Sequence, residues 1–330
     1  MESSDSVVIS NESEAFVWLQ KALSGNLGEN LVAVSFRGWP VVEIRLEGPG
    51  YASTVTPEIA RALMQYQQAL NRSYARAVRG AATSRALTAA EKNHLRLKAR
   101  VEGGSSLIKI DFGEQFAALA SEVVGKMSPG NLIILTLGLA FIAASALAYK
   151  WYLNSQAENK KIEETERSRI AMSSEETRRL ELVMRAFEKN LGLNAAKEDF
   201  DDARHEVIRG VADAQSLSVN GLKISNETAK AIAASERKSS REVQLNGNYQ
   251  ILEVHWDNDG EVRLGLLDSD TRREFFATMC DGTLDQAQID LVQHAEWARE
   301  KVYMSINAHE LRGEITKATV ISVALQPPEK

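Results

Sequence analysis

Apolar residues dominate one stretch in the middle of the chain. Between Asn131 and Lys150 no residue is charged, and a helix of this length covers nearly the whole ~30 Å hydrocarbon core of a bilayer at about 1.5 Å per residue. Tyr149, Lys150, Trp151 and Tyr152 stand at its end, where amphipathic rings and a snorkelling lysine suit the headgroup region. The pattern predicts a transmembrane helix from residue 131 to residue 153, with these four side chains as membrane-interface anchors. The alternative is a buried core helix, which seldom runs so far without a polar face.

Small residues recur along that segment at intervals of four. Thr136, Ala140, Ala144 and Ala148 fall on one face of a helix. Small side chains at this spacing let two membrane helices approach closely, although alanine is common in any membrane helix. The stripe predicts association between transmembrane helices, and with it a homo-oligomer.

Before the apolar segment, the pattern predicts an α+β domain over residues 1–113. Alternating apolar positions indicate two β-hairpins, one turning at Gly38-Trp39-Pro40 and one at Gly103-Gly104-Ser105. A helix from about Asn11 to Leu23 precedes the first hairpin, and a longer one from Thr56 to Gly80 precedes the second. This order favours a four-stranded antiparallel sheet with helices on one face. A further helix over residues 114–130 leads to the membrane segment.

After the apolar segment, three regions follow. Residues 154–172 are highly charged and lack an apolar period, which predicts a stalk or linker. Residues 173–240 read as helical, beginning with a capping box of Ser173 and Glu176. Residues 241–330 form a β-rich α+β domain in which three strands, a helix and two strands follow one another. That order is the order of an OB-type barrel, and it also occurs in unrelated small α+β domains.

One face of the helix that follows Thr56 is rich in arginine. Residues of this face and of the following strand predict contact with anionic lipid headgroups or another phosphate: Arg61, Arg72, Arg76, Arg79, Arg96, Lys98 and Arg100. The alternative is an ordinary solvated face, since these positions lie opposite the apolar stripe.

Residues typical of catalytic and metal sites form no recognisable motif. Cys280 is the only cysteine, so neither an internal disulfide nor a Cys-rich metal site is possible. The run from Asp257 to Gly260 begins like a calcium loop, but its twelfth position is Asp268 instead of the required Glu. His205 and Glu206 lack the second histidine of a zinc-protease signature. The sequence therefore predicts no catalytic residues, no metal site and no cofactor.

Charge separates the two ends of the chain. Residues 1–130 are near neutral, with 13 Asp and Glu against 14 Lys and Arg, whereas residues 154–330 contain 32 against 24 and so carry the net acidity of the chain. Strong nucleic-acid binding is therefore not expected there. Lys150, Lys160, Lys161, Arg167 and Arg169 follow the apolar segment, and the positive-inside rule then favours a cytoplasmic C-terminal domain.

These patterns together predict a non-enzymatic, single-pass membrane protein, in the inner membrane of a bacterium. It would act as a tethered sensor, signalling or interaction protein with a domain on each side, and its partners would be membrane lipids, a further copy of itself and another protein. One alternative is a structural or assembly subunit of an envelope complex. Another is a membrane-anchored hydrolase or nuclease whose site the sequence does not announce.

Overall fold

The computed structural model describes residues 5–27, 31–48, 51, 54–81, 83–102, 106–159, 171–212, 214–234, 241–256, 261–280, 285–311 and 314–326. Over these residues the protein is of the α+β class, as predicted. The chain divides into two compact units. Unit 1 comprises Met1–Val78 and Ala89–Ser235, and unit 2 comprises Arg79–Thr88 and Glu236–Lys330.

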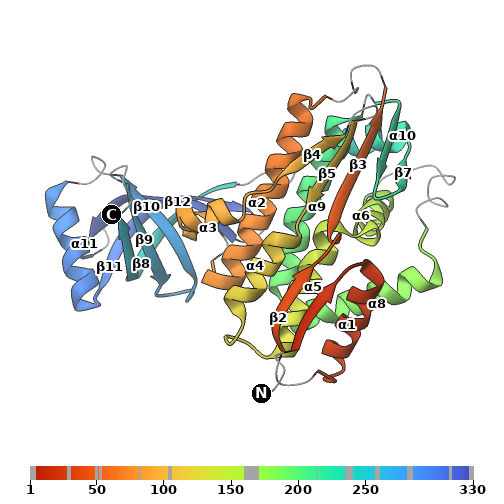
Figure 1. Cartoon of the computed structure of the whole chain (residues 1–330). Coiled ribbons are helices and arrows are strands. Elements are labelled where there is room, and N and C mark those ends of the chain that lie inside the picture. Colours follow the sequence, from red (N-terminus) through yellow and green to blue (C-terminus); the bar gives the residue numbers. More distant parts are fainter. Residues whose placement is uncertain are drawn as a thin grey trace. The chain divides into compact units, whose positions relative to one another are not determined.

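Unit 1 consists of two sheets and a layer of helices (Figure 1). Its elements in chain order are β1 (Asp5–Ile9), α1 (Glu12–Leu23), β2 (Leu31–Phe36), β3 (Val41–Glu47), α2 (Pro57–Arg79), α3 (Ala89–His94), β4 (Ala99–Glu102), β5 (Ser106–Asp111), α4 (Gly113–Val123), α5 (Pro129–Ala144), α6 (Ala146–Asn159), α8 (Ser174–Lys189), α9 (Gly192–Gly210), β6 (Ser216–Val219), β7 (Leu222–Ile224) and α10 (Asn226–Ala233).

The larger sheet of unit 1 has five strands in the order β4-β5-β3-β6-β7, all antiparallel. Buried and exposed residues alternate along β3, so helices cover one face of the sheet, as predicted. The predicted four-stranded sheet is wrong in its membership, because β6 and β7 come from beyond the apolar segment. Ile44 of β3 lies opposite Val219 of β6. The chain before and the chain after the apolar segment therefore share one sheet.

The strand β2 does not enter this sheet. It pairs in parallel with β1, with Val34 opposite Val7, whereas β3 pairs with β5. The predicted first hairpin is therefore wrong, because the link through the cis Trp39–Pro40 bond leads from one sheet to the other. The second hairpin is confirmed by the pairing of β4 with β5, and its turn at residues 103–105 lies outside the described residues.

The apolar segment forms two helices. α5 and α6 meet at Ser145 with a bend of 64°, so the single helix predicted from residue 131 to residue 153 is wrong. Taken one at a time, the described helices are each too short or too polar to cross a membrane, and only α5 joined to residues 146–156 meets the requirements of length and composition. The residues from Leu132 to Ala144 are all buried within unit 1, where α5 packs on α1, α4, α8 and α9.

Ser145 separates the two helices by its capping bonds. Its backbone is extended, with φ −74° and ψ 139°, and its hydroxyl accepts a hydrogen bond from the Leu147 N–H at 3.0 Å. A serine in this conformation typically starts a new helix. The same hydroxyl donates to Glu12 of α1 at 2.7 Å. The bend is thus fixed to a neighbouring helix.

Glycine allows α9 to approach α5 closely. A Cβ atom at Gly138 would lie 2.7 Å from Cδ1 of Leu193, which is closer than real Cβ contacts.

The predicted capping box at the start of α8 is confirmed, since the side chains of Ser173 and Glu176 each hydrogen-bond the backbone N–H of the other. The predicted stalk lies largely outside the described residues, at 160–170.

Unit 2 is built on a closed five-stranded barrel. Its elements are a short 3-10 helix (Ser84–Ala86), β8 (Arg241–Trp256), β9 (Glu261–Asp268), β10 (Glu274–Cys280), α11 (Gln286–Ala298), β11 (Lys301–Leu311) and β12 (Glu314–Ala324). The strand order is β10-β12-β11-β8-β9, in which β10 and β12 are parallel and the other pairs antiparallel. The predicted order of three strands, a helix and two strands is confirmed, as is the barrel. The turn at 257–260 lies outside the described residues.

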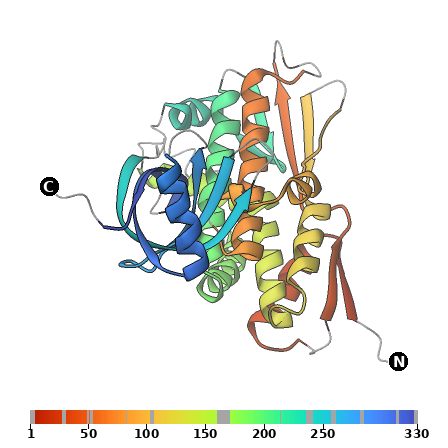
Figure 2. The same cartoon turned by 90° about the vertical axis from the view of Figure 1, so that its left-hand side faces the viewer.

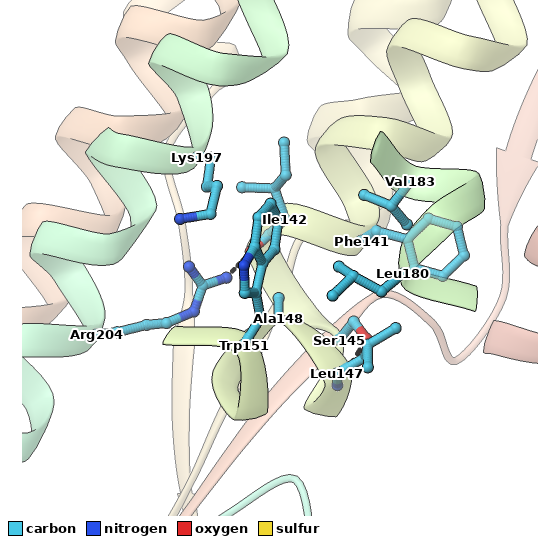
Figure 3. A pocket seen from close by; sticks show the side chains of 10 residues that line it. All are labelled: Phe141, Ile142, Ser145, Leu147, Ala148, Trp151, Leu180, Val183, Lys197 and Arg204. Carbon is cyan, nitrogen blue, oxygen red and sulfur yellow. Dashed lines mark hydrogen bonds between the residues drawn. The ribbon is translucent and has the colours of Figure 1, made fainter. Parts of the chain in front are cut away.

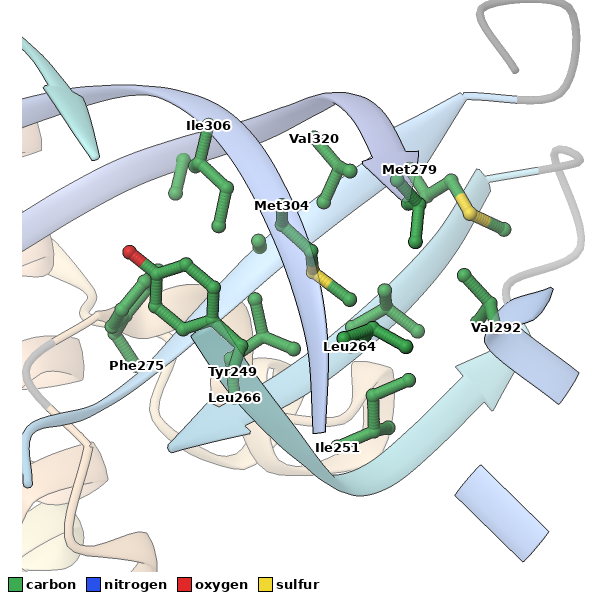
Figure 4. Close-up of a cluster of buried hydrophobic side chains, with 14 of the residues drawn as sticks. Tyr249, Ile251, Leu264, Leu266, Phe275, Met279, Val292, Met304, Ile306 and Val320 are labelled. Carbon is green, nitrogen blue, oxygen red and sulfur yellow. The ribbon is translucent and has the colours of Figure 1, made fainter. Parts of the chain in front are cut away.

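Side chains from all five strands fill the barrel (Figure 4). Tyr249, Leu264, Phe275 and Met304 are among them, and Val292 of α11 packs against the same cluster. The segment Arg79–Thr88 adds polar contacts where β10 meets β12. There Arg85 donates to Oγ1 of Thr278 at 3.2 Å, and Thr83 donates to the carbonyl of Thr316 at 3.3 Å. A segment far upstream in the sequence therefore belongs to the barrel unit.

Candidate functional site

The predicted arginine face contains two residues that bind a buried acid. Asp199 of α9 is 3 % exposed, and it lies 2.9 Å from Arg72 and 2.7 Å from Arg76, both on α2. Figure 2 shows α2 (orange) beside α9 (green). The expectation that Arg72 and Arg76 face solvent is therefore wrong. A buried carboxylate between two guanidinium groups is stable only in such pairing, and here it ties the two helices together.

The other predicted phosphate-binding residues are exposed. Arg61 lies early on α2, Arg96 and Lys98 precede β4, and Arg100 lies on β4. Arg79 belongs to the segment that joins unit 2. Asp199 thus binds two residues of the predicted face, and phosphate binding by the exposed ones stays a prediction.

A second group of polar contacts surrounds the bend between α5 and α6. It consists of the side chains of Tyr149, Lys197, Asp201 and Arg204 and the backbone carbonyl of Ile142, which together we call the bend cluster. Arg204 is only 1 % exposed. Its guanidinium donates to the Ile142 carbonyl (Figure 3). It also donates to Asp201 at 2.6 Å and lies 5.1 Å from the centre of the Tyr149 ring. Ile142 is in the last turn of α5, whose carbonyl groups have no partner within the helix. Arg204 therefore caps the end of the apolar helix.

The predicted membrane anchors all have partners within unit 1. Tyr149 hydrogen-bonds Tyr66, and Tyr152 lies 3.1 Å from Nδ1 of His205. Lys150 donates to Glu176 at 2.7 Å. Trp151 lies 5.9 Å from the Phe187 ring, and the Lys197 ammonium lies 4.3 Å above its indole. An anchoring role at a bilayer surface would require different partners.

The predicted helix-association stripe is also inside the unit. Thr136, Ala140 and Ala144 are buried on α5, and Ala148 lies beyond the bend on α6. The four residues therefore do not form one exposed face in this arrangement, and association of two copies through them stays a prediction.

The bend cluster has little capacity for chemistry. The cavity it borders, lined also by Trp151, has a volume of about 10 Å³, which is about the space of one water molecule. Burial raises the pKa of the Tyr66 hydroxyl and of the Glu12 carboxyl above their usual values. The Tyr66 hydroxyl therefore stays protonated at neutral pH. The cluster instead holds α5, α6 and α9 together.

A larger cleft of about 320 Å³ lies at the start of α5. Leu23, Leu27 and the residues from Ser128 to Asn131 line it, and Lys189 contributes a charged side chain. Within the described part of the chain, no three His, Cys, Asp or Glu side chains are grouped to hold a metal ion.

Large apolar side chains are exposed at one end of the barrel, and we call Leu252, Trp297 and Leu325 the barrel-end surface. Trp297 is 92 % exposed near the end of α11. β11 starts at Lys301, which lies opposite Gln250, two residues before Leu252. Tyr303 lies opposite Ala324, the residue before Leu325. The strand register thus places Leu252 and Leu325 towards the end of the barrel where β11 begins, and Trp297 lies four residues before that start along the chain.

The position of Trp297 on its helix could have indicated from the sequence that it is exposed. α11 buries Val292 and Ala295, and Trp297 follows Gln293 and Asp290 on the opposite, polar side of the helix. A tryptophan among polar residues is unusual on a solvated face.

Comparison of the chain with family models, with curated proteins and with solved structures gives no match.

Proposed function

We propose that this protein is a non-enzymatic interaction protein whose barrel binds a basic segment of a protein partner. The barrel-end surface is the contact region. The observation that carries the proposal is the exposed Trp297 on a helix that otherwise packs its apolar side chains on the barrel. Tryptophan is among the residues most enriched at the energetic centre of protein interfaces.

The topology of unit 2 supports a binding module. Counted within the barrel, the strands follow the order 1-2-3-5-4, and the helix lies between the third and fourth strands. We infer from this order that the barrel is of the OB type, a fold that commonly serves recognition. Fold alone does not define the ligand.

Charge defines the chemistry of the partner. The barrel region is acidic, and Glu296 and Glu300 flank Trp297 along the chain. An acidic surface attracts a basic partner and disfavours nucleic acid. The partner segment that fits is a basic one that offers an apolar pocket or side chain to the indole.

Position-specific photocrosslinking in cells that carry the gene tests this proposal. We expect benzoylphenylalanine at Trp297 to give one discrete protein adduct. A second variant carries it at Lys317, an exposed residue paired with His309 towards the other end of β11, and should give no adduct. Leu325→Glu should abolish the adduct from position 297.

The tryptophan should matter for binding and not for folding. Because its side chain is 92 % exposed, Trp297→Ala should change the free energy of unfolding by less than about 0.5 kcal/mol. Equal adducts from positions 297 and 317, or none from position 297, would refute a specific contact at this end of the barrel.

Attachment to a bacterial inner membrane stays a prediction, supported by the length and composition of the bent pair α5–α6. A role as an assembly subunit of a larger complex would use the same barrel-end surface.

A further inference from the structure

The strand β4 forms one edge of the five-stranded sheet (Figure 1). Among the described residues it pairs with β5 alone, and all four of its residues are exposed. An edge strand leaves a row of backbone N–H and C=O groups unpaired, and this row can accept a strand from another chain.

An apolar row crosses the sheet and reaches that edge. Val101 of β4 lies opposite Ile108 of β5, which lies opposite Ile44 of β3, followed by Val219 of β6. Ile108, Ile44 and Val219 are buried, whereas Val101 is 37 % exposed. The apolar face of the sheet is therefore left incomplete at β4.

The charges on the other face of β4 are also incompletely matched. Arg100 lies directly opposite Lys109 of β5, and two like charges in this position repel each other. Lys109 is bound by Glu102 at 3.1 Å and by Glu43 at 3.4 Å. In the described part of the chain, Arg100 has no ion-pair partner.

We infer that the β4 edge pairs with the β4 edge of a second copy of this chain. In a two-fold antiparallel pair centred on Val101, the two Val101 side chains face each other and extend the apolar row. On the opposite face, Arg100 of each copy lies opposite Glu102 of the other. Such pairing joins the two sheets into one continuous sheet of ten strands.

Charge selects this register among the possible ones. A pair centred on Arg100 would place two arginines opposite each other, and a pair centred on Glu102 would place two acids together. Charged edges normally hinder pairing with foreign strands. Here the opposite signs at positions 100 and 102 make the edge complementary to itself.

Sedimentation equilibrium of the full chain at low salt tests the inference. We expect wild type to form a reversible dimer, and Arg100→Glu and Glu102→Arg each to weaken it about tenfold or more, because each change creates two like-charge pairs across the two-fold axis. Arg96→Glu makes the same change of charge just before β4 and should leave the dimer intact. Circular dichroism would establish that each variant is folded.

Mixing the two single variants is the decisive experiment. An Arg100→Glu chain has acids at both positions and a Glu102→Arg chain has arginines at both, so a heterodimer of the two has opposite charges throughout. We expect the mixture, and also the double variant Arg100→Glu/Glu102→Arg, to recover dimer formation. A monomeric wild type, a dimer indifferent to the single changes, or a mixture that stays monomeric would each overturn the inference.

Discussion

The barrel of unit 2 has an apolar interior, whereas the helical layer of unit 1 encloses charged groups. Leu264, Met304 and their neighbours form the barrel core. In unit 1, Asp199 and Arg204 are buried as fully as the apolar side chains around them. Each of the two joins elements that are distant in the sequence. The barrel depends on buried area, and unit 1 depends in addition on a small number of buried polar contacts.

This difference has a physical cause in the apolar helix α5. Its side chains give it no polar stripe, so apolar contact alone does not define its rotation. Hydrogen bonds to its last carbonyl groups define this rotation. Arg204 donates to the Ile142 carbonyl, and Asn220 donates to the Ala144 carbonyl. Polar groups on α9 and on the β6–β7 turn thereby orient a helix that itself has no charged side chain.

The largest effect should follow from removing the buried acid of unit 1. Asp199→Ala leaves two guanidinium groups without their carboxylate, and breaking a buried ion pair in this way costs about 3–5 kcal/mol. Urea unfolding followed by the helical circular-dichroism signal measures this, because most of the described helices belong to unit 1. Glu188→Ala, an exposed acid on α8, is the control. A loss below about 1 kcal/mol would mean that the Asp199 contacts are not structural.

A substitution that creates a cavity in the barrel core should destabilise unit 2 alone. Leu266 is fully buried and its neighbour Leu267 points to the other side of β9 and is half-buried. Leu266→Ala should cost about 2–5 kcal/mol, and Leu267→Ala clearly less. Hydrogen exchange resolved by mass spectrometry measures the two units separately, and only the barrel strands should exchange faster. Equal acceleration in the helices of unit 1 would show that the two interiors unfold together.

The order of strands and helix in the barrel could be predicted from the sequence because its signals are local. Apolar residues alternate along each strand, and the helix begins with a polar cap. The apolar segment could not be assigned in the same way, since a membrane span and a core helix both lack a polar face. The bend at Ser145 depends on a contact with Glu12, which no local pattern reveals.

The polar contacts of unit 1 could not be predicted for a related reason. Asp199 lies inside α9, and aspartate is seldom buried unless it is paired. Its partners Arg72 and Arg76 are more than a hundred residues upstream. Pairing of β3 with β6 likewise spans the apolar segment. A single sequence shows which residues are apolar, and it does not show which distant residues meet.

The smallest expected loss of stability follows from removing a polar contact at the surface of unit 1. The Lys150 ammonium donates to Glu176 and holds the pKa of that carboxyl below its usual value, with help from the backbone and hydroxyl of Ser173 and against a smaller effect of burial. A carboxyl whose pKa is lowered by folding stabilises the folded state above its unfolded pKa, and this contribution is lost as the pH falls through the folded pKa.

Lys150→Met should therefore lower the free energy of unfolding at neutral pH, and the difference from wild type should shrink as the pH falls below the ordinary carboxyl value of 4.5. Because the Glu176 side chain is 34 % exposed, solvent screens the pair and the effect should stay below about 1 kcal/mol. Thermal unfolding of both proteins across the acid range measures it. Arg179→Met, which removes the partner of the exposed Glu175 on the same helix, is the matched control and should show a smaller change. A difference between wild type and Lys150→Met that grows on acidification would contradict the assignment, because the contact requires an ionised Glu176.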